Sequence, residues 1–79
     1  MPNDMHTALL GEIRAEMARR QVTRASVAQV TDSDPATVGR WLSGKTSIRL
    51  ESLIQVCDLL GVSLEELAHR AAPTNKDVA

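Results

Sequence analysis

The 79-residue chain has few aromatic and cysteine residues: no Phe, no Tyr, one Trp and one Cys. Apolar residues make up 43% of the sequence, so the core of one small domain must be built from Leu, Val, Ile, Met and Ala. Single-strand nucleic-acid binders stack bases on aromatic side chains, and this chain lacks such platforms. Cys57 has no second cysteine for a disulfide or a metal site. Its apolar register with Leu53 and Leu60 predicts that it fills the core.

The sequence also lacks the parts of a membrane protein and of an enzyme. No segment approaches the roughly twenty apolar residues of a membrane span, and Met1-Pro2-Asn3-Asp4 does not resemble the start of a signal peptide. His6 and His69 lie at opposite ends of the chain, and no catalytic triad, glycine-rich phosphate loop or metal-ligand cluster accompanies them. We therefore expect a soluble cytoplasmic protein that is not an enzyme, without a metal, a cofactor or a small-molecule ligand.

Two short helices separated by a polar turn are predicted in the middle of the chain. In the second, Asp34 is a good N-cap, Pro35 fits the first helical position, and Gly44 ends the helix. Its apolar face has the i, i+3, i+4 spacing of Val38, Trp41 and Leu42. Upstream, Thr23 caps a helix whose inward face is Val27, Ala28 and either Val30 or Thr31. This is the layout of a helix-turn-helix, which makes DNA the first partner to test.

Three further helices are predicted around this pair. They run from Thr7 to about Arg20, from Leu50 to Leu60 before Gly61, and onward from the capping box of Ser63 and Glu66. The expected core positions are Leu9 or Leu10, Ile13, Met17, Leu53, Ile54, Val56, Cys57, Leu60, Leu64, Leu67 and Ala68. The other faces of the first helix carry Glu12, Arg14, Glu16 and Arg19. We expect an all-α fold, a compact five-helix bundle with a central helix-turn-helix over residues 1–70, and a flexible tail over residues 71–79.

A set of residues spread over most of the chain carries a family resemblance: Val27-Ala28, Val38, Trp41, Gly44-Lys45, Leu50, Leu53, Leu60-Gly61-Val62-Ser63-Leu64 and Leu67. On these positions, about residues 7–68 resemble the phage-repressor-like helix-turn-helix family, the lambda repressor and Cro type also called XRE-like. The resemblance implies a lambda-repressor-like domain whose recognition helix, about residues 34–43, enters the major groove. It further implies a sequence-specific transcriptional regulator of double-stranded DNA, such as a small phage repressor, a Cro-like protein or a bacterial XRE-type regulator. Such a protein acts in a bacterial cell or a phage-infected host.

The resemblance places the base-reading positions at Pro35, Ala36 and Arg40, with Thr37 and Gly39 nearby. Pro35 and Ala36 offer apolar contact to a thymine methyl group. Arg40 is the one side chain there able to donate two hydrogen bonds to guanine O6 and N7, worth about 1–3 kcal/mol of discrimination. The alternative is that Arg40 reaches a phosphate or remains in solvent, since most protein–DNA hydrogen bonds go to the backbone.

Candidates for phosphate binding are more numerous. They are Thr23, Arg24, Ser33, Ser43, Lys45, Thr46 and Ser47. Arg24 follows the Thr23 cap at a helix N-terminus, where side-chain charge and helix dipole act together. The resemblance places Lys45, Thr46 and Ser47 in a loop beside the DNA strand, and Arg14 and Arg49 extend the surface. Each of these charges, taken alone, is also compatible with an ordinary solvated side chain.

Net charge does not by itself indicate a nucleic-acid binder, because it is −1 with a pI near 6.0. The charges are unevenly distributed, however. Residues 14–49 carry seven basic and three acidic side chains, whereas residues 50–79 carry two basic and five acidic ones. A basic half of this kind would steer a duplex to one face of the domain.

The chain departs from the family pattern at three positions. Gln21 and Asp32 stand where the family commonly has Gly, although Asp tolerates the left-handed backbone that such a turn requires. Gly39 weakens the recognition helix by roughly 1 kcal/mol relative to Ala. The recognition helix is also poor in Gln, Asn and Ser, so one subunit makes few direct contacts to bases. Specificity must then come from Arg40, methyl contacts, DNA shape or dimerisation.

A homodimer on paired half-sites is expected from the resemblance. The candidate surface is the last two helices through Leu59, Leu64 or His69, although these leucines are equally compatible with the core. The rival to a DNA-binding regulator is a protein-interaction module on the same fold, such as an antitoxin or adaptor whose main partner is another protein. Binding to duplex DNA that weakens as salt rises would separate the two.

Overall fold

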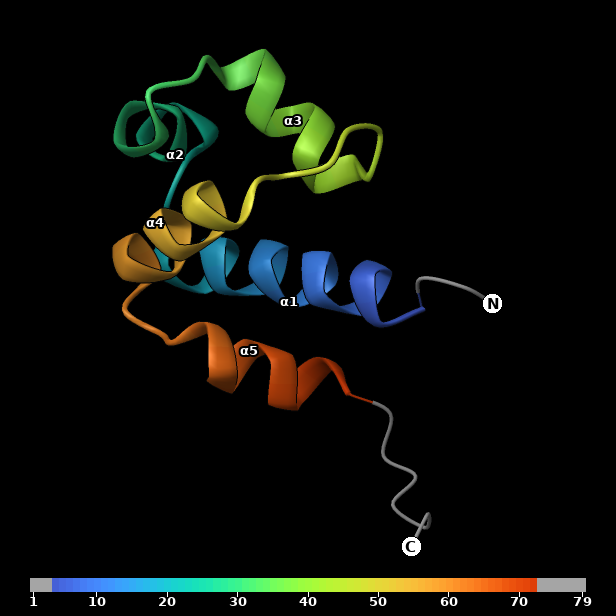
Figure 1. Cartoon of the computed structure of the whole chain (residues 1–79). Helices are drawn as coiled ribbons and strands as arrows, with labels where there is room; N and C mark the ends of the chain where they lie inside the picture. The colour runs from blue at the N-terminus through green and yellow to red at the C-terminus, as the bar shows by residue number, and fades with distance from the viewer. Residues whose placement is uncertain (1–3, 73–79) are drawn as a thin grey trace, which may run out of the picture.

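The computed structural model describes residues 4–72, which form five helices joined by short turns and one loop. The helices are α1 (Asp4–Arg20), α2 (Arg24–Thr31), α3 (Pro35–Ser43), α4 (Leu50–Leu60) and α5 (Leu64–Ala71). In Figure 1, α1 crosses the middle of the molecule, with α2 and α3 on one side and α5 on the other. Helix α4 contacts α1, α2 and α5. Since residues 4–72 contain no strand, the predicted all-α fold with a central helix-turn-helix is confirmed.

Three helices begin at the side-chain caps that the sequence predicts. The caps are Thr23 Oγ1 with the Ser26 N–H (3.1 Å), Asp34 Oδ1 with the Thr37 N–H (2.8 Å) and Ser63 Oγ with the Glu66 N–H (2.9 Å). Each cap satisfies a donor that has no partner in the first turn of a helix. Because donor and acceptor are three residues apart in every case, these helix starts depend on local sequence alone.

Each of the first four helices is followed by a residue whose backbone is in the left-handed conformation. Gly44 and Gly61 have φ values of +82° and +76°, and Gln21 and Asp32 both have a φ of +57°. In the turn after α2, the Asp32 N–H donates to the Ala28 carbonyl oxygen. A left-handed residue with a side chain costs free energy relative to Gly, and Asp bears that cost better than most residues. The departures from the family pattern at Gln21 and Asp32 therefore leave the helix ends in place.

The core contains aliphatic side chains from all five helices and one indole ring. Its members are Leu10, Ile13, Met17, Val27, Ala28, Val38, Trp41, Leu42, Leu53, Val56, Cys57, Leu60 and Leu67. Of the two pairs that the sequence leaves open, Leu10 and Thr31 are buried, while Val30 is exposed. The Thr31 hydroxyl donates to the Val27 carbonyl oxygen at 2.8 Å, which satisfies it inside the core. Burial raises the pKa of the Cys57 thiol, so it stays protonated as a core side chain.

The structure corrects several sequence predictions about faces and boundaries. Helix α1 begins at Asp4, one turn before the predicted start at Thr7. Ile54, predicted in the core, is 45% exposed because its position on α4 turns away from the buried side of that helix. Helix α5 continues through Ala71, a buried residue that the sequence assigns to the tail. The rest of that predicted tail, residues 73–79, lies outside the described residues.

Glu16 is the largest departure from the predicted pattern, because it is only 3% exposed although the sequence places it on an outer face. Its carboxylate accepts hydrogen bonds from Arg19 Nη1 (2.7 Å) and Arg20 Nε (2.7 Å) on the same helix. Arg70 Nη1 from α5 donates a third at 2.6 Å. The hydrogen bonds from Arg20 and Arg70 outweigh the effect of burial and lower the Glu16 pKa to about 2. An ion pair therefore joins α1 to α5 on the side of the molecule away from α3.

The three residues predicted for a dimer surface have unequal exposure. Leu59 and Leu64 are half-buried and pack against the core, whereas His69 is exposed. The largest exposed apolar side chains of α4 are Leu50, at 63%, and Ile54. No helix among residues 4–72 is long and apolar enough to cross a membrane. The same residues contain no group of three or more His, Cys, Asp or Glu side chains placed to hold a metal ion.

Candidate nucleic-acid interface

Helix α3 has one buried face and one exposed face. Its apolar residues Val38, Trp41 and Leu42 are in the core. Pro35, Ala36, Arg40 and Ser43 are exposed, and Thr37 is half-buried. In Figure 1, α3 lies at the edge of the molecule opposite α5, so its exposed face is open to a large partner.

Arg40 is held on the exposed face of α3 by a neighbour one turn earlier. Its Nη2 donates to Thr37 Oγ1 at 3.1 Å. The Asp34 carboxylate caps the N-terminus of α3, and the hydrogen bonds from Thr37 lower the pKa of this carboxyl group. Two of the predicted base-reading side chains, Thr37 and Arg40, are thus brought together, while Pro35 and Ala36 leave the first turn small and apolar.

The N-terminus of α2 borders one side of α3. Thr23 caps this end, and the first turn of α2 contains no acidic residue. The Arg24 guanidinium lies across α3 at Gly39, since a Cβ atom added to Gly39 would be 2.9 Å from Arg24 Nη1 and 3.3 Å from Cζ. Gly39 therefore permits a close approach that any larger residue would obstruct. The sequence predicts Gly39 to be a neighbour of the base-reading positions and a weak helix former, and it does not predict this contact with Arg24.

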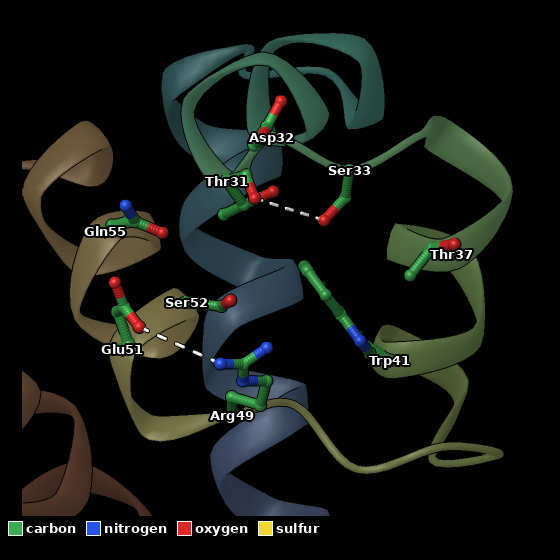
Figure 2. Close-up of a pocket in the computed structure, with 9 residues that line it drawn as sticks. All are labelled: Thr31, Asp32, Ser33, Thr37, Trp41, Arg49, Glu51, Ser52 and Gln55. Carbon is green, nitrogen blue, oxygen red and sulfur yellow. Dashed lines mark hydrogen bonds and ion pairs between the residues drawn. The ribbon is translucent and has the colours of Figure 1, made fainter.

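A polar hollow of about 500 Å³ lies on the other side of α3, between the turn, α3 and the start of α4. Figure 2 shows its nine lining residues: Thr31, Asp32, Ser33, Thr37, Trp41, Arg49, Glu51, Ser52 and Gln55. The Ser33 hydroxyl donates to the Thr31 carbonyl oxygen at 3.2 Å. Arg49 Nη2 lies 4.0 Å from Glu51 Oε1. Ser33, predicted to bind phosphate with Arg24, is therefore on the opposite side of α3 from Arg24.

The loop after α3 keeps the remaining predicted phosphate contacts at the surface. Lys45, Thr46 and Ser47 are all exposed. The Lys45 N–H donates to the Arg40 carbonyl oxygen at 2.9 Å, and the Ser43 hydroxyl donates to the same oxygen at 3.2 Å. These bonds tie the start of the loop to the end of the recognition helix.

Ion pairing divides the basic side chains into two groups. Arg19, Arg20 and Arg70 bind Glu16, and Arg49 lies beside Glu51. Within the part of the chain that the structure describes, four basic side chains have no carboxylate within ion-pair distance: Arg14, Arg24, Arg40 and Lys45. All four lie on or around α3, whereas Arg19, Arg20 and Arg70 are held at Glu16. Free positive charge is thus concentrated around the exposed face of α3, a feature that whole-chain charge conceals.

Comparison with known proteins agrees with this geometry. Residues 12–72 match the model of the Cro/C1-type HTH DNA-binding domain family, which covers all of α2, α3, α4 and α5 and most of α1. No curated protein and no solved structure matches the chain. Because the matched family model spans well over half of the sequence, this protein belongs to the Cro/C1-type helix-turn-helix DNA-binding family.

Proposed function

We propose that this protein is a sequence-specific transcriptional regulator that inserts α3 into the major groove of double-stranded DNA. The supporting observation is the cluster of Arg14, Arg24, Arg40 and Lys45 around the exposed face of α3, with no carboxylate partner among the described residues. A duplex presents a dense row of phosphates that such charges neutralise. Within this proposal the regulator is a small repressor of the phage or XRE type, because the chain belongs to the Cro/C1-type family.

Arg40 is the base-reading residue of this proposal, with Thr37, Ala36 and Pro35 beside it. The hydrogen bond to Thr37 restricts the Arg40 guanidinium to the exposed face of α3. A restricted guanidinium loses less side-chain entropy when it binds guanine. Pro35 and Ala36 make apolar contacts, so they supply little discrimination beyond a thymine methyl group.

The phosphate contacts of the proposal fall on both sides of α3. Thr23, Arg24 and Ser43 lie on one side, Ser33 lies on the other, and Lys45, Thr46 and Ser47 follow the helix. A helix in the major groove has a DNA backbone on each side, so the two groups would meet opposite strands. These contacts set the position of α3 without reading sequence.

We further propose that two copies bind paired half-sites. One copy offers a single long polar side chain, Arg40, on the exposed face of α3, so its direct readout covers few base pairs. Doubling the module doubles the recognised sequence, and a two-fold axis in the protein requires a palindromic site. Sedimentation of the protein with and without a palindromic duplex tests this arrangement, and one copy per site would contradict it.

Selection of bound duplexes from a random pool, followed by fluorescence anisotropy titrations, tests the proposed function. Affinity for a selected duplex should fall with salt at a log–log slope of about −0.9 per neutralised phosphate. Arg40→Ala should relax the preference at one base position by about 1–3 kcal/mol. Lys45→Ala should weaken binding to selected and random duplexes equally, and it should make the salt slope less negative by about one.

Two outcomes would contradict this reasoning. If Arg40→Ala weakens selected and random duplexes by the same factor, Arg40 binds the backbone instead of a base. If the wild-type protein binds neither random nor genomic duplexes at low salt, it is not a DNA-binding regulator. A protein partner then becomes the first alternative to pursue.

A further inference from the structure

A second hollow borders α3 where α1, α2 and α3 meet. It has a volume of about 330 Å³ and is lined by Arg14, Arg24, Gly39, Leu42 and Ser43. Two of these lining residues are arginines from different helices, and no acidic residue among residues 5–72 lines the hollow. The hollow is distinct from the larger one beside Trp41 in Figure 2, which includes both Asp32 and Glu51.

Arg24 forms one wall of this hollow. Its guanidinium rests on Gly39, with Nη1, Cζ and Nε all within 4 Å of the point where a Cβ atom would be. The absence of a side chain at Gly39 thus allows the charged group to lie against the α3 backbone.

Arg14 also lines this hollow and is positioned by α3 itself. Its Nη1 donates to the Leu42 carbonyl oxygen near the end of that helix. Helix C-termini attract positive charge, because their last carbonyl groups lack intrahelical donors. Gly39 and Leu42 are three residues apart, so the points at which the two guanidinium groups touch α3 are separated by roughly 4.5 Å along its axis.

Charge in this hollow is uncompensated. Neither Arg14 nor Arg24 lies within ion-pair distance of a carboxylate in residues 5–72. At Glu16, by contrast, three arginines converge on one carboxylate. Two guanidinium groups that line the same hollow present several N–H donors to it, which suits a tetrahedral oxyanion with acceptors on more than one side.

We propose that Arg14 and Arg24 together bind one phosphodiester group of the DNA backbone in this hollow. This inference rests on the proposed function and adds a DNA contact from Arg14 of α1. The sequence predicts only that Arg14 extends the phosphate-binding surface. Gly39 is the residue that leaves room for the phosphate and for Arg24. One phosphate held from two helices fixes both the depth and the rotation of α3 in the groove, because its position is tied to α1 and α2 at once.

The test uses a selected duplex in which single phosphates are replaced, one at a time, by uncharged methylphosphonates. For the wild-type protein, one position on a half-site strand should cost roughly tenfold or more in affinity, the scale of a hydrogen bond between charged groups. At that same position, Arg14→Gln and Arg24→Gln should each lose most of this effect. Arg19→Gln serves as the matched control, because Arg19 binds Glu16 away from α3, and it should keep the wild-type pattern. Melting curves establish that each variant folds.

Two outcomes would overturn the inference while leaving the proposed function intact. These are sensitivity of the two variants at different phosphates, or a pattern for Arg14→Gln that matches the wild type. If the wild-type protein binds no duplex, the proposed function fails and the contact with DNA fails with it. Titration with inorganic phosphate then tests separately whether the two arginines form a phosphate site. Saturable shifts of the Gly39 amide and of the arginine Nε–H signals, absent in both variants, would support the two-arginine site. Unchanged signals in the wild-type protein would refute it.

Discussion

Replacing Gly39 by alanine should make the protein more stable and its DNA binding weaker. Gly39 lies inside α3, where alanine is favoured over glycine by about 0.8–1.0 kcal/mol. The new Cβ atom would be 2.9 Å from Arg24 Nη1, so the guanidinium must move. It is the far end of an exposed, flexible side chain and moves at little cost. The net gain should be about 0.5–1 kcal/mol, which raises the melting temperature by about 4 °C in a domain of this size.

Binding should respond in the opposite direction. The Arg24 guanidinium moves away from the α3 backbone, and the added methyl group occupies part of the hollow between Arg24 and α3. The affinity for a selected duplex should fall about tenfold, as expected when one contact between charged groups is lost. Calorimetry and anisotropy titrations of the same Gly39→Ala sample measure the two effects.

Gly11→Ala is the matched control. Gly11 is also inside a helix, and the nearest atom to its added Cβ would be Arg14 Nη2 at 3.8 Å, an ordinary contact distance. This variant should gain similar stability and bind DNA as the wild type does. If Gly39→Ala binds the selected duplex with wild-type affinity, the contact between the Arg24 guanidinium and Gly39 has no role in DNA binding. A lower melting temperature for Gly39→Ala would refute the account of its stability.

Two further predictions concern the fold. The pKa of Glu16 falls from 4.5 in the unfolded chain to about 2 in the folded protein. The ionised carboxylate therefore stabilises the fold above a pH of about 5, and this stabilisation is lost as the pH falls from 4.5 to about 2. The melting temperature of Glu16→Gln should therefore be lower at pH 7 and fall less on acidification, whereas parallel pH profiles would contradict the assigned ion pairs. Leu60→Ala, at a fully buried position, should cost about 2–5 kcal/mol in the free energy of unfolding. Ile54→Ala should stay within about 0.5 kcal/mol of the wild type; similar losses in urea unfolding would place both side chains in the core.

Helix boundaries in this protein are encoded by short segments. The caps at Thr23, Asp34 and Ser63 each bind an N–H three residues away, and Gly44 and Gly61 end helices through their own backbone freedom. These interactions form within one turn, so the sequence predicts them without knowledge of the rest of the fold. The helical spacing of apolar residues predicts most of the core, because the apolar face of a helix packs against the other helices and the polar face remains in solvent.

Periodicity is insufficient at the margins of each face. Ile54 is one residue from Leu53, yet one is exposed and the other is buried. Apolar character alone does not decide between them, because the outcome depends on where the neighbouring helices end. Burial of Glu16 depends on Arg70, which is 54 residues away in the sequence. A pattern of neighbouring residues cannot predict a contact between residues so far apart in the chain.

The candidate interface shows the same division. The sequence by itself determined that α3 is a capped helix with an exposed face carrying Arg40, since both follow from residues 34–44. Only the tertiary structure decided which cations of residues 5–72 lie apart from every described carboxylate, that Arg24 rests on Gly39 and that Arg14 binds the end of α3. The physical reason is the range of the interactions: caps and apolar stripes act within a few residues, whereas charge pairing and close backbone approach depend on how whole helices pack.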